Sequence, residues 1–96
     1  MVKTDAFDAA RHLTTASAQT ELLNDALASG NAPYFAHALG VIARARGMTG
    51  VAREAGVTRE ALYKALSEDG DPRLTTLLSV VRALGIKLSA SVTPTP

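Results

Sequence analysis

The sequence predicts an all-α domain of five to six helices that ends in a short, β-strand-like tail. Apolar residues recur at helical spacing in successive segments separated by Gly or Pro, and alanine dominates the 47% hydrophobic fraction, which favours closely packed helices. With 96 residues, the chain has room for one modest core and therefore one domain. We expect its parts to be an N-terminal helical extension (1–30), a helical core (31–85) and a tail (86–96).

The segment 48–66 has the spacing of a helix-turn-helix. In its first helix the small residue Ala52 allows a second helix to approach closely, and Gly56 permits the left-handed backbone that ends this helix. Val57 is expected to fill the corner, and Thr58 to cap the second helix with its hydroxyl. The second helix is expected to bury Ala61, Leu62, Ala65 and Leu66. An ordinary helical hairpin shares this spacing, so the outward face has to distinguish the two.

That outward face of the second helix carries Arg59, Glu60, Tyr63 and Lys64. Arg59 is the first candidate for a base contact, because a guanidinium can reach guanine O6 and N7 together. The alternative is a surface arginine that pairs with Glu60 or another neighbour. Lys64 and Arg53 suit phosphates or are solvated charges. Tyr63 either meets the DNA backbone or lies half-buried beside the helix. These side chains favour DNA binding over a plain hairpin.

The net charge of +1 is unevenly distributed. Residues 1–40 carry two basic and four acidic side chains, whereas residues 41–64 carry five basic and two acidic ones. The positive excess therefore coincides with the suspected DNA-binding unit. Because the excess is small and phosphate neutralisation supplies much of the affinity for DNA, we expect the protein to bind as a dimer.

Three helices are expected before the motif. The first spans about 5–13, and the hydroxyl-rich run 14–17 breaks it and offers caps to the second, which spans about 18–29. The third spans about 31–46, with Pro33 in its first turn and Gly40 at a close helix crossing. The residues expected to be buried are Phe7, Ala10 and Leu13, then Leu22, Leu23, Ala26 and Leu27, then Phe35, Leu39, Ile42 and Ala43.

A last helix is expected after the polar loop 67–72, with Asp71 as its cap and Pro72 as its first residue. Its apolar face would consist of Leu74, Leu77, Leu78, Val81 and Leu84. In the tail, apolar and polar residues then alternate with the period of a strand up to Pro94 and Pro96. The tail either lies extended over the core or pairs with its twin or a partner protein through Ile86, Leu88, Ala90 and Val92.

The run from Tyr34 to Ser89 resembles the probable addiction-module antidote proteins, which are HigA-like antitoxins of the lambda-repressor-like, XRE-type helix-turn-helix group. The resemblance is most specific through Leu66, because a generic helix-turn-helix would share only its glycine and apolar positions. The segments that carry it are Ala38-Leu39-Gly40, the run from Ala43 to Thr49, the run from Ala52 to Leu66, Leu84-Gly85, and, near the start, Phe7-Asp8-Ala9-Ala10.

This resemblance implies a small cytoplasmic antitoxin of a type II toxin–antitoxin module. Such a protein neutralises a RelE/HigB-like toxin that degrades messenger RNA, and represses its own operon by binding double-stranded DNA as a homodimer. In repressors of this fold, the first residues of the second motif helix meet base edges. The candidate base contacts are therefore Thr58, Arg59, Glu60 and Tyr63, and the candidate phosphate contacts are Arg53, Lys64 and Arg73.

Other functional classes have little support in the sequence. The chain has no cysteine, and its histidines, His12 and His37, lack the spacing of a metal site, so we expect no metal and no cofactor. No nucleophile–base grouping indicates an enzyme, and the apolar runs are too short for a membrane span. Two alternatives stay open: a transcriptional regulator without a toxin partner, and a toxin-binding module with little DNA binding.

Overall fold

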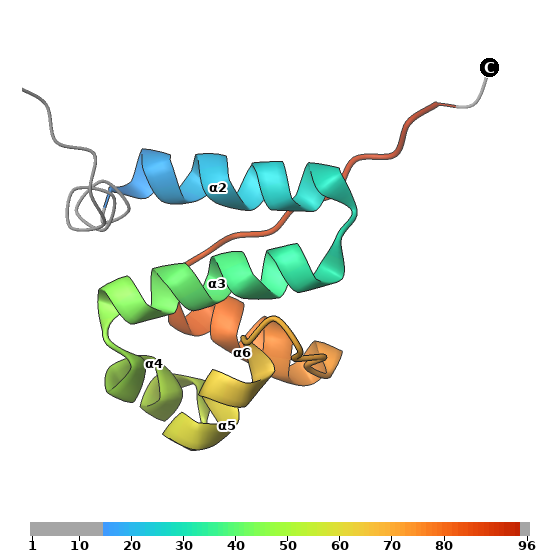
Figure 1. Cartoon of the computed structure of the whole chain (residues 1–96). Coiled ribbons are helices and arrows are strands. Elements are labelled where there is room, and N and C mark those ends of the chain that lie inside the picture. The colour runs from blue at the N-terminus through green and yellow to red at the C-terminus, as the bar shows by residue number, and fades with distance from the viewer. Residues whose placement is uncertain (1–14, 95–96) are drawn as a thin grey trace, which may run out of the picture.

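The computed structural model describes residues 15–94, and this range contains five α-helices and no strand. The helix predicted over 5–13 and Pro96 lie outside the described residues. No described helix combines the length and apolarity needed to cross a bilayer. In chain order the helices are α2 (Ala16–Ser29), α3 (Ala32–Arg46), α4 (Met48–Ala55), α5 (Arg59–Ala65) and α6 (Leu74–Ala83), as Figure 1 shows.

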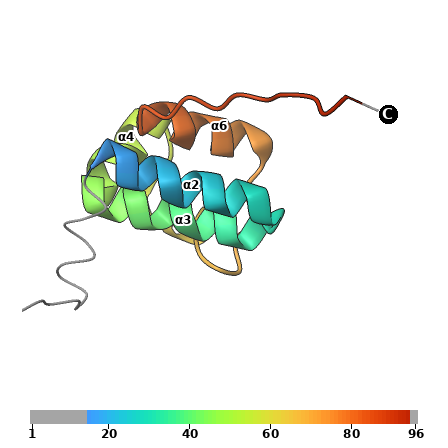
Figure 2. The ribbon, with the colours of Figure 1, turned by 90° about the horizontal axis from the view of Figure 1, so that it is seen from above.

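Helices α2 and α3 form an antiparallel pair, and they lie side by side in the views of Figures 1 and 2. The Thr15 hydroxyl caps α2 by accepting a hydrogen bond from the Ala18 N–H (3.2 Å), so α2 begins two residues earlier than predicted. Gly30 ends α2 with a left-handed φ of 69°. The Asn31 side chain then caps α3 by accepting from the Tyr34 N–H (2.9 Å), as the start of the third helix predicted.

Helix α3 is the centre of the molecule, since it packs on α2 on one side and the three short helices lie on its other side (Figure 1). Its Leu39 and Ile42 are fully buried. Gly40 lies where the end of α5 crosses α3: a Cβ at this position would be 3.0 Å from the Leu66 carbonyl oxygen. The predicted close crossing is therefore confirmed. The buried core also includes Leu23, Ala26, Phe35, Met48, Val51, Ala52, Leu62, Leu66, Val80, Val81 and Leu84.

Several apolar residues that were expected to be buried are exposed. In α6 the buried face comprises Val80, Val81 and Leu84, with Leu77 partly buried against the core, which is a helical i, i+3, i+4, i+7 pattern. Val80 was not among the residues predicted to be buried, and two of the predicted residues lie outside this face. The wrongly predicted residues are Leu27 (48% exposed), Leu74 (67%), Leu78 (47%) and Ala61.

The start of α6 also differs from the prediction. Its N-cap is Arg73, with extended backbone and no side-chain capping bond, so Asp71 and Pro72 belong to the loop. The loop runs close to the end of α5 at Gly70, where an added Cβ would collide with the main chain of Lys64 and Ala65. The chain therefore turns into α6 only after it has passed the end of α5.

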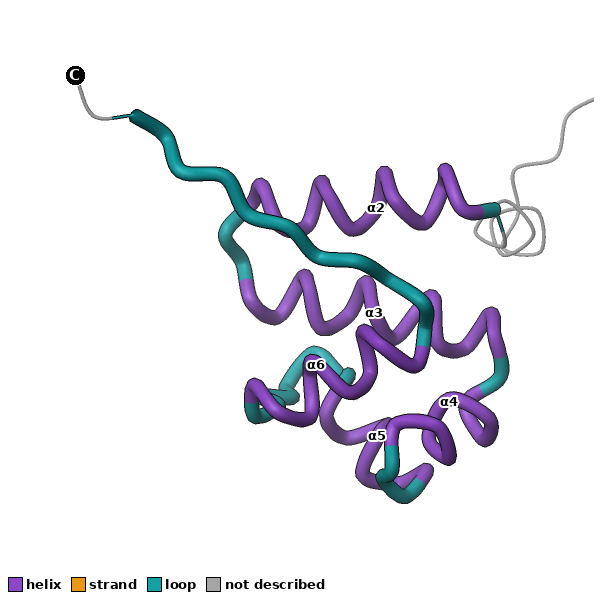
Figure 3. The backbone as a smooth tube through the Cα atoms, turned by 180° about the vertical axis from the view of Figure 1, so that it is seen from behind, coloured by secondary structure: helices purple, strands orange, loops and turns teal. Residues whose placement is uncertain are grey.

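The tail is extended but forms no strand in residues 86–94 (Figure 3). Gly85 ends α6 with a φ of 70°, and the Ile86 N–H donates to the Val81 carbonyl (3.0 Å). Ile86 packs against the core, whereas Leu88, Ala90 and Val92 are exposed. A lone segment has no second strand to bond with, so the described tail is extended without forming a ladder. The alternative of a tail over the core is met at Ile86 and not along the rest of the segment.

Candidate nucleic-acid interface

The turn between α4 and α5 is built as the motif spacing predicted. Gly56 adopts a left-handed φ of 76° at the end of α4. The Val57 N–H donates to the Ala52 carbonyl (3.0 Å), which also accepts from the Gly56 N–H, so both amides of the turn are bonded to the last turn of α4. The Val57 side chain packs against the core, so the prediction that it fills this corner is confirmed. The two short helices are thus held at a fixed angle by a main-chain turn.

Helix α5 presents one buried and one exposed side. The Thr58 hydroxyl accepts from the Ala61 N–H (3.0 Å), which confirms the predicted cap. Leu62, and Leu66 just after the helix, are at most 1% exposed and hold it on the core. The residues predicted to point outward are all exposed: Arg59, Glu60, Tyr63 and Lys64. The cap Thr58 is exposed as well.

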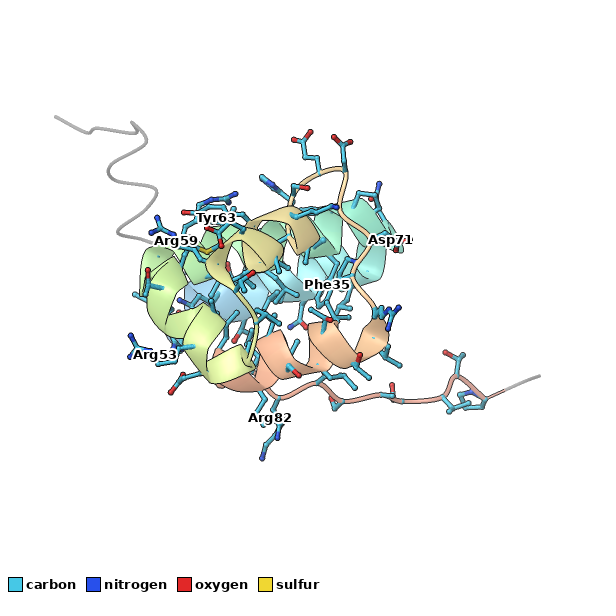
Figure 4. All side chains as sticks on the ribbon, turned by 90° about the horizontal axis from the view of Figure 1, so that it is seen from below. Phe35, Arg53, Arg59, Tyr63, Asp71 and Arg82 are labelled. Atoms are coloured by element: carbon cyan, nitrogen blue, oxygen red, sulfur yellow. The ribbon has the colours of Figure 1, made fainter. Side chains whose placement is uncertain are left out.

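Tyr63 is the meeting point of two guanidinium groups. The Arg59 Cζ lies 5.6 Å from the centre of the Tyr63 ring, and Figure 4 shows these two side chains next to each other on α5. The Cζ of Arg44, which comes from α3, lies 5.8 Å from the same ring centre. Both distances are in the range of cation–π contacts. In the described residues Arg59 therefore pairs with a neighbour, the Tyr63 ring, and not with Glu60, and its base contact stays a prediction.

The sequence predicted no role for Arg44 beyond its part in the local charge. Arg44 and Tyr63 meet only through the packing of α3 against the end of α5, which local spacing does not reveal. A signal was present in Gly40, one helical turn before Arg44. A Cβ at Gly40 would lie 3.3 Å from Arg44 Nη1, so a glycine there leaves room for the arginine.

The other predicted contacts are spread over a wider surface. Lys64 lines a shallow hollow with Asp71 and Pro72, and the exposed Arg73 follows these two residues directly. Arg53 is exposed on α4 and lies apart from Arg59 and Tyr63 in Figure 4. The structure therefore groups Arg59 with Tyr63, adds Arg44 to them, and leaves Arg53 at a distance.

One of the five basic residues between 41 and 64 has a structural task. Arg46 Nη2 donates to the Leu84 carbonyl (2.7 Å), so Arg46 ties the end of α3 to the end of α6. A cation at a helix C-terminus also interacts favourably with the helix dipole. The four remaining cations are exposed: Arg44, Arg53, Arg59 and Lys64. Such a surface, with an aromatic ring among guanidiniums, is suited to bind a polyanion.

Comparison with known proteins gives a family. Residues 3–92 match the model of the family described as "Probable addiction module antidote protein". The chain is also 46% identical, over 81 residues, to an "Uncharacterized protein" of Haemophilus influenzae; the match covers 84% of each protein. No solved structure gives a significant match.

Proposed function

This chain belongs to the family of probable addiction module antidote proteins, and from this premise we propose a type II antitoxin with two activities. It binds and neutralises a RelE/HigB-like, mRNA-degrading toxin encoded beside it. It also represses its own operon as a homodimer of lambda-repressor-like, XRE-type helix-turn-helix domains. Both activities are binding and neither is catalysis, and the place of action is the cytoplasm.

The observation that carries the DNA-binding half of this proposal is the exposed side of α5. Arg59, Tyr63 and Lys64 are exposed, while Leu62 holds the opposite side of α5 in the core. In the proposed complex α5 lies in the major groove, where its N-terminal residues face base edges. We assign base contacts to Thr58, Arg59, Glu60 and Tyr63, and phosphate contacts to Arg53, Lys64 and Arg73.

The dimer is proposed to form through the tail. Leu88 and Val92 are exposed apolar residues (38% and 90%), and Ala90 lies between them on the same side of an extended segment. Extended backbone with free hydrogen-bonding groups pairs readily with a second such segment. Ile86 anchors the start of each tail on its own core.

Binding to the DNA upstream of the gene tests the repressor activity. We expect Arg59→Ala to weaken binding to this duplex about 10- to 100-fold, because a bidentate base contact contributes about 1–3 kcal/mol of discrimination. Lys64→Ala should weaken binding to all duplexes and reduce the salt dependence by about one phosphate. The matched control is Arg82→Ala, since Arg82 is an exposed arginine on α6 and lies away from Arg59 in Figure 4.

Co-expression with the neighbouring gene tests the antitoxin activity. We expect the neighbour alone to arrest growth and the pair to restore it. If this chain binds the upstream duplex specifically but does not relieve the growth arrest, the result supports a transcriptional regulator that has no toxin partner. If it restores growth but binds the upstream duplex no better than unrelated DNA, the result supports a toxin-binding module with little DNA binding.

A further inference from the structure

We infer that Arg44 of α3 is a further DNA contact, and that Tyr63 is the positioning residue that orients both Arg44 and Arg59 for phosphates and bases. This inference rests on the proposed DNA binding and extends the interface beyond α4 and α5. Its basis is the convergence of two guanidiniums on one ring, at 5.8 and 5.6 Å. Tyr63 thus orients the two guanidiniums in the free protein, in addition to making the DNA contact assigned to it above.

The electrostatics of this cluster favour an anion. Arginine stays protonated at any pH relevant to a protein, so the ring of Tyr63 has two permanent positive charges near it. Within residues 15–94 neither guanidinium has a carboxylate partner. Two unneutralised like charges repel each other, and a bound phosphate between or beside them removes this repulsion. A backbone phosphate of DNA supplies such a charge, with oxygens that accept from guanidinium N–H groups.

The position of Arg44 is built into the helix packing. Gly40 lies one turn before Arg44, and an added Cβ there would come within 3.3 Å of Arg44 Nη1 and within 3.3 Å of the Leu66 Cβ. The guanidinium thus lies along its own helix toward the end of α5. From there it reaches the exposed side of α5 although it belongs to a different helix.

The contacts with the Tyr63 ring restrict both arginine side chains before DNA binds. The two side chains therefore lose less conformational entropy on binding. A free arginine side chain has about 2 kcal/mol of rotamer entropy. Contact with a ring that is itself anchored on α5, next to the buried Leu62, restricts the guanidinium before DNA arrives. Preorganisation of this kind raises affinity without any new contact.

The experiment compares the full chain and four variants on two duplexes, the upstream region of its own gene and an unrelated duplex of equal length, over a range of salt. Arg44→Gln should weaken binding to both duplexes and lower the salt slope by about one unit, as the loss of one phosphate contact requires. Arg82→Gln, which removes the same charge from α6, should leave the slope unchanged. Tyr63→Leu should reduce the preference for the upstream duplex, because Arg59 loses its support. Tyr63→Phe keeps the ring and loses only the hydroxyl, so it should reduce the preference less than Tyr63→Leu does.

A measurement without DNA completes the test. NMR relaxation of the arginine Nε–H groups should show Arg44 and Arg59 more restricted than Arg82 in the wild type, and released by Tyr63→Leu. If the wild type binds the upstream duplex specifically but Arg44→Gln behaves like Arg82→Gln, the inference is overturned and the proposed function stands. If the wild type binds neither duplex, the proposed repressor activity fails and the inference fails with it.

Discussion

The substitution Gly70→Ala should destabilise the protein, whereas Gly50→Ala should stabilise it. Neither glycine has a positive φ, so what separates them is the space around each Cβ. At Gly70 an added Cβ would meet the main chain of the last turn of α5, with the Ala65 carbonyl carbon at 2.7 Å. At Gly50, inside α4, an added Cβ meets nothing within 4 Å.

The expected magnitudes follow from these surroundings. Overpacking against main chain costs about 1–3 kcal/mol, because no side-chain rotation relieves it. In an open helical position, alanine is more favourable than glycine by up to about 1 kcal/mol. The variants should therefore differ by roughly 2–4 kcal/mol, of which about 1–3 kcal/mol comes from the collision at Gly70 and up to about 1 kcal/mol from the better helix former at position 50.

Urea denaturation of both variants at one protein concentration measures this difference. Thermal unfolding gives a second readout. One kcal/mol corresponds to about 4–8 °C for a domain of this size, so the melting temperatures of the two variants should differ by about 10 °C or more. Equal stability of Gly70→Ala and Gly50→Ala would refute this prediction, because it would mean that a Cβ at position 70 does not collide with the main chain of α5.

Three other predictions concern single contacts. The Tyr34 hydroxyl donates to Asp25 Oδ2 (2.5 Å), and this hydrogen bond raises the pKa of Tyr34. The bond stabilises the fold fully below the ordinary tyrosine pKa. This stabilisation is lost as the pH rises through the raised pKa of Tyr34. Ultraviolet titration should therefore show Tyr34 ionising at lower pH in Asp25→Asn. Arg46→Ala removes the bond to the Leu84 carbonyl and should cost about 1 kcal/mol in urea denaturation. Leu62→Ala empties a fully buried site under α5 and should cost about 2–5 kcal/mol by the same assay.

Matched variants control these predictions. Tyr63→Phe leaves Tyr34 as the sole tyrosine, so that the titration reports one group. Arg46→Lys keeps the charge without the guanidinium and should recover part of the lost stability. If Arg46→Ala is as stable as the wild type, the bond from Arg46 to the Leu84 carbonyl does not stabilise the end of α6. Leu78→Ala, at an exposed site, should change stability by less than about 0.5 kcal/mol, and a cost equal to that of Leu62→Ala would contradict the assigned burial.

The parts of the fold that the sequence predicted are those governed by neighbouring residues. The turn at Gly56 and the cap at Thr58 depend on backbone conformation and on a hydroxyl three residues from its partner. The cap at Asn31, the residue at which the third helix was predicted to begin, is of the same kind. Such features are decided within a few residues, so residue type and spacing are sufficient to locate them.

The features that were missed depend on residues far apart in the chain. Asp71 has the chemistry of a helix cap, but the contact of Gly70 with the end of α5 delays the start of α6. Leu78 has the right spacing for a core residue, but the orientation of α6 places Val80 inside instead. Arg44 joins the candidate interface because α3 crosses the end of α5, and periodicity within α3 contains no information about that crossing.

The orientation of α5 is therefore decided by residues that are not proposed to touch DNA. A helix of seven residues is too short to be stable alone, so it depends on what surrounds it. Leu62 packs α5 on the core. The missing side chain of Gly40 lets the end of α5 pack closely on α3, and that of Gly70 lets the following loop pass close to the last turn of α5. A larger residue at either glycine would tilt α5 and move Arg59 while every exposed side chain kept its identity. Loss of DNA binding in such a variant would thus reflect the position of the helix, which is why interface substitutions have to be compared with stability measured on the same protein.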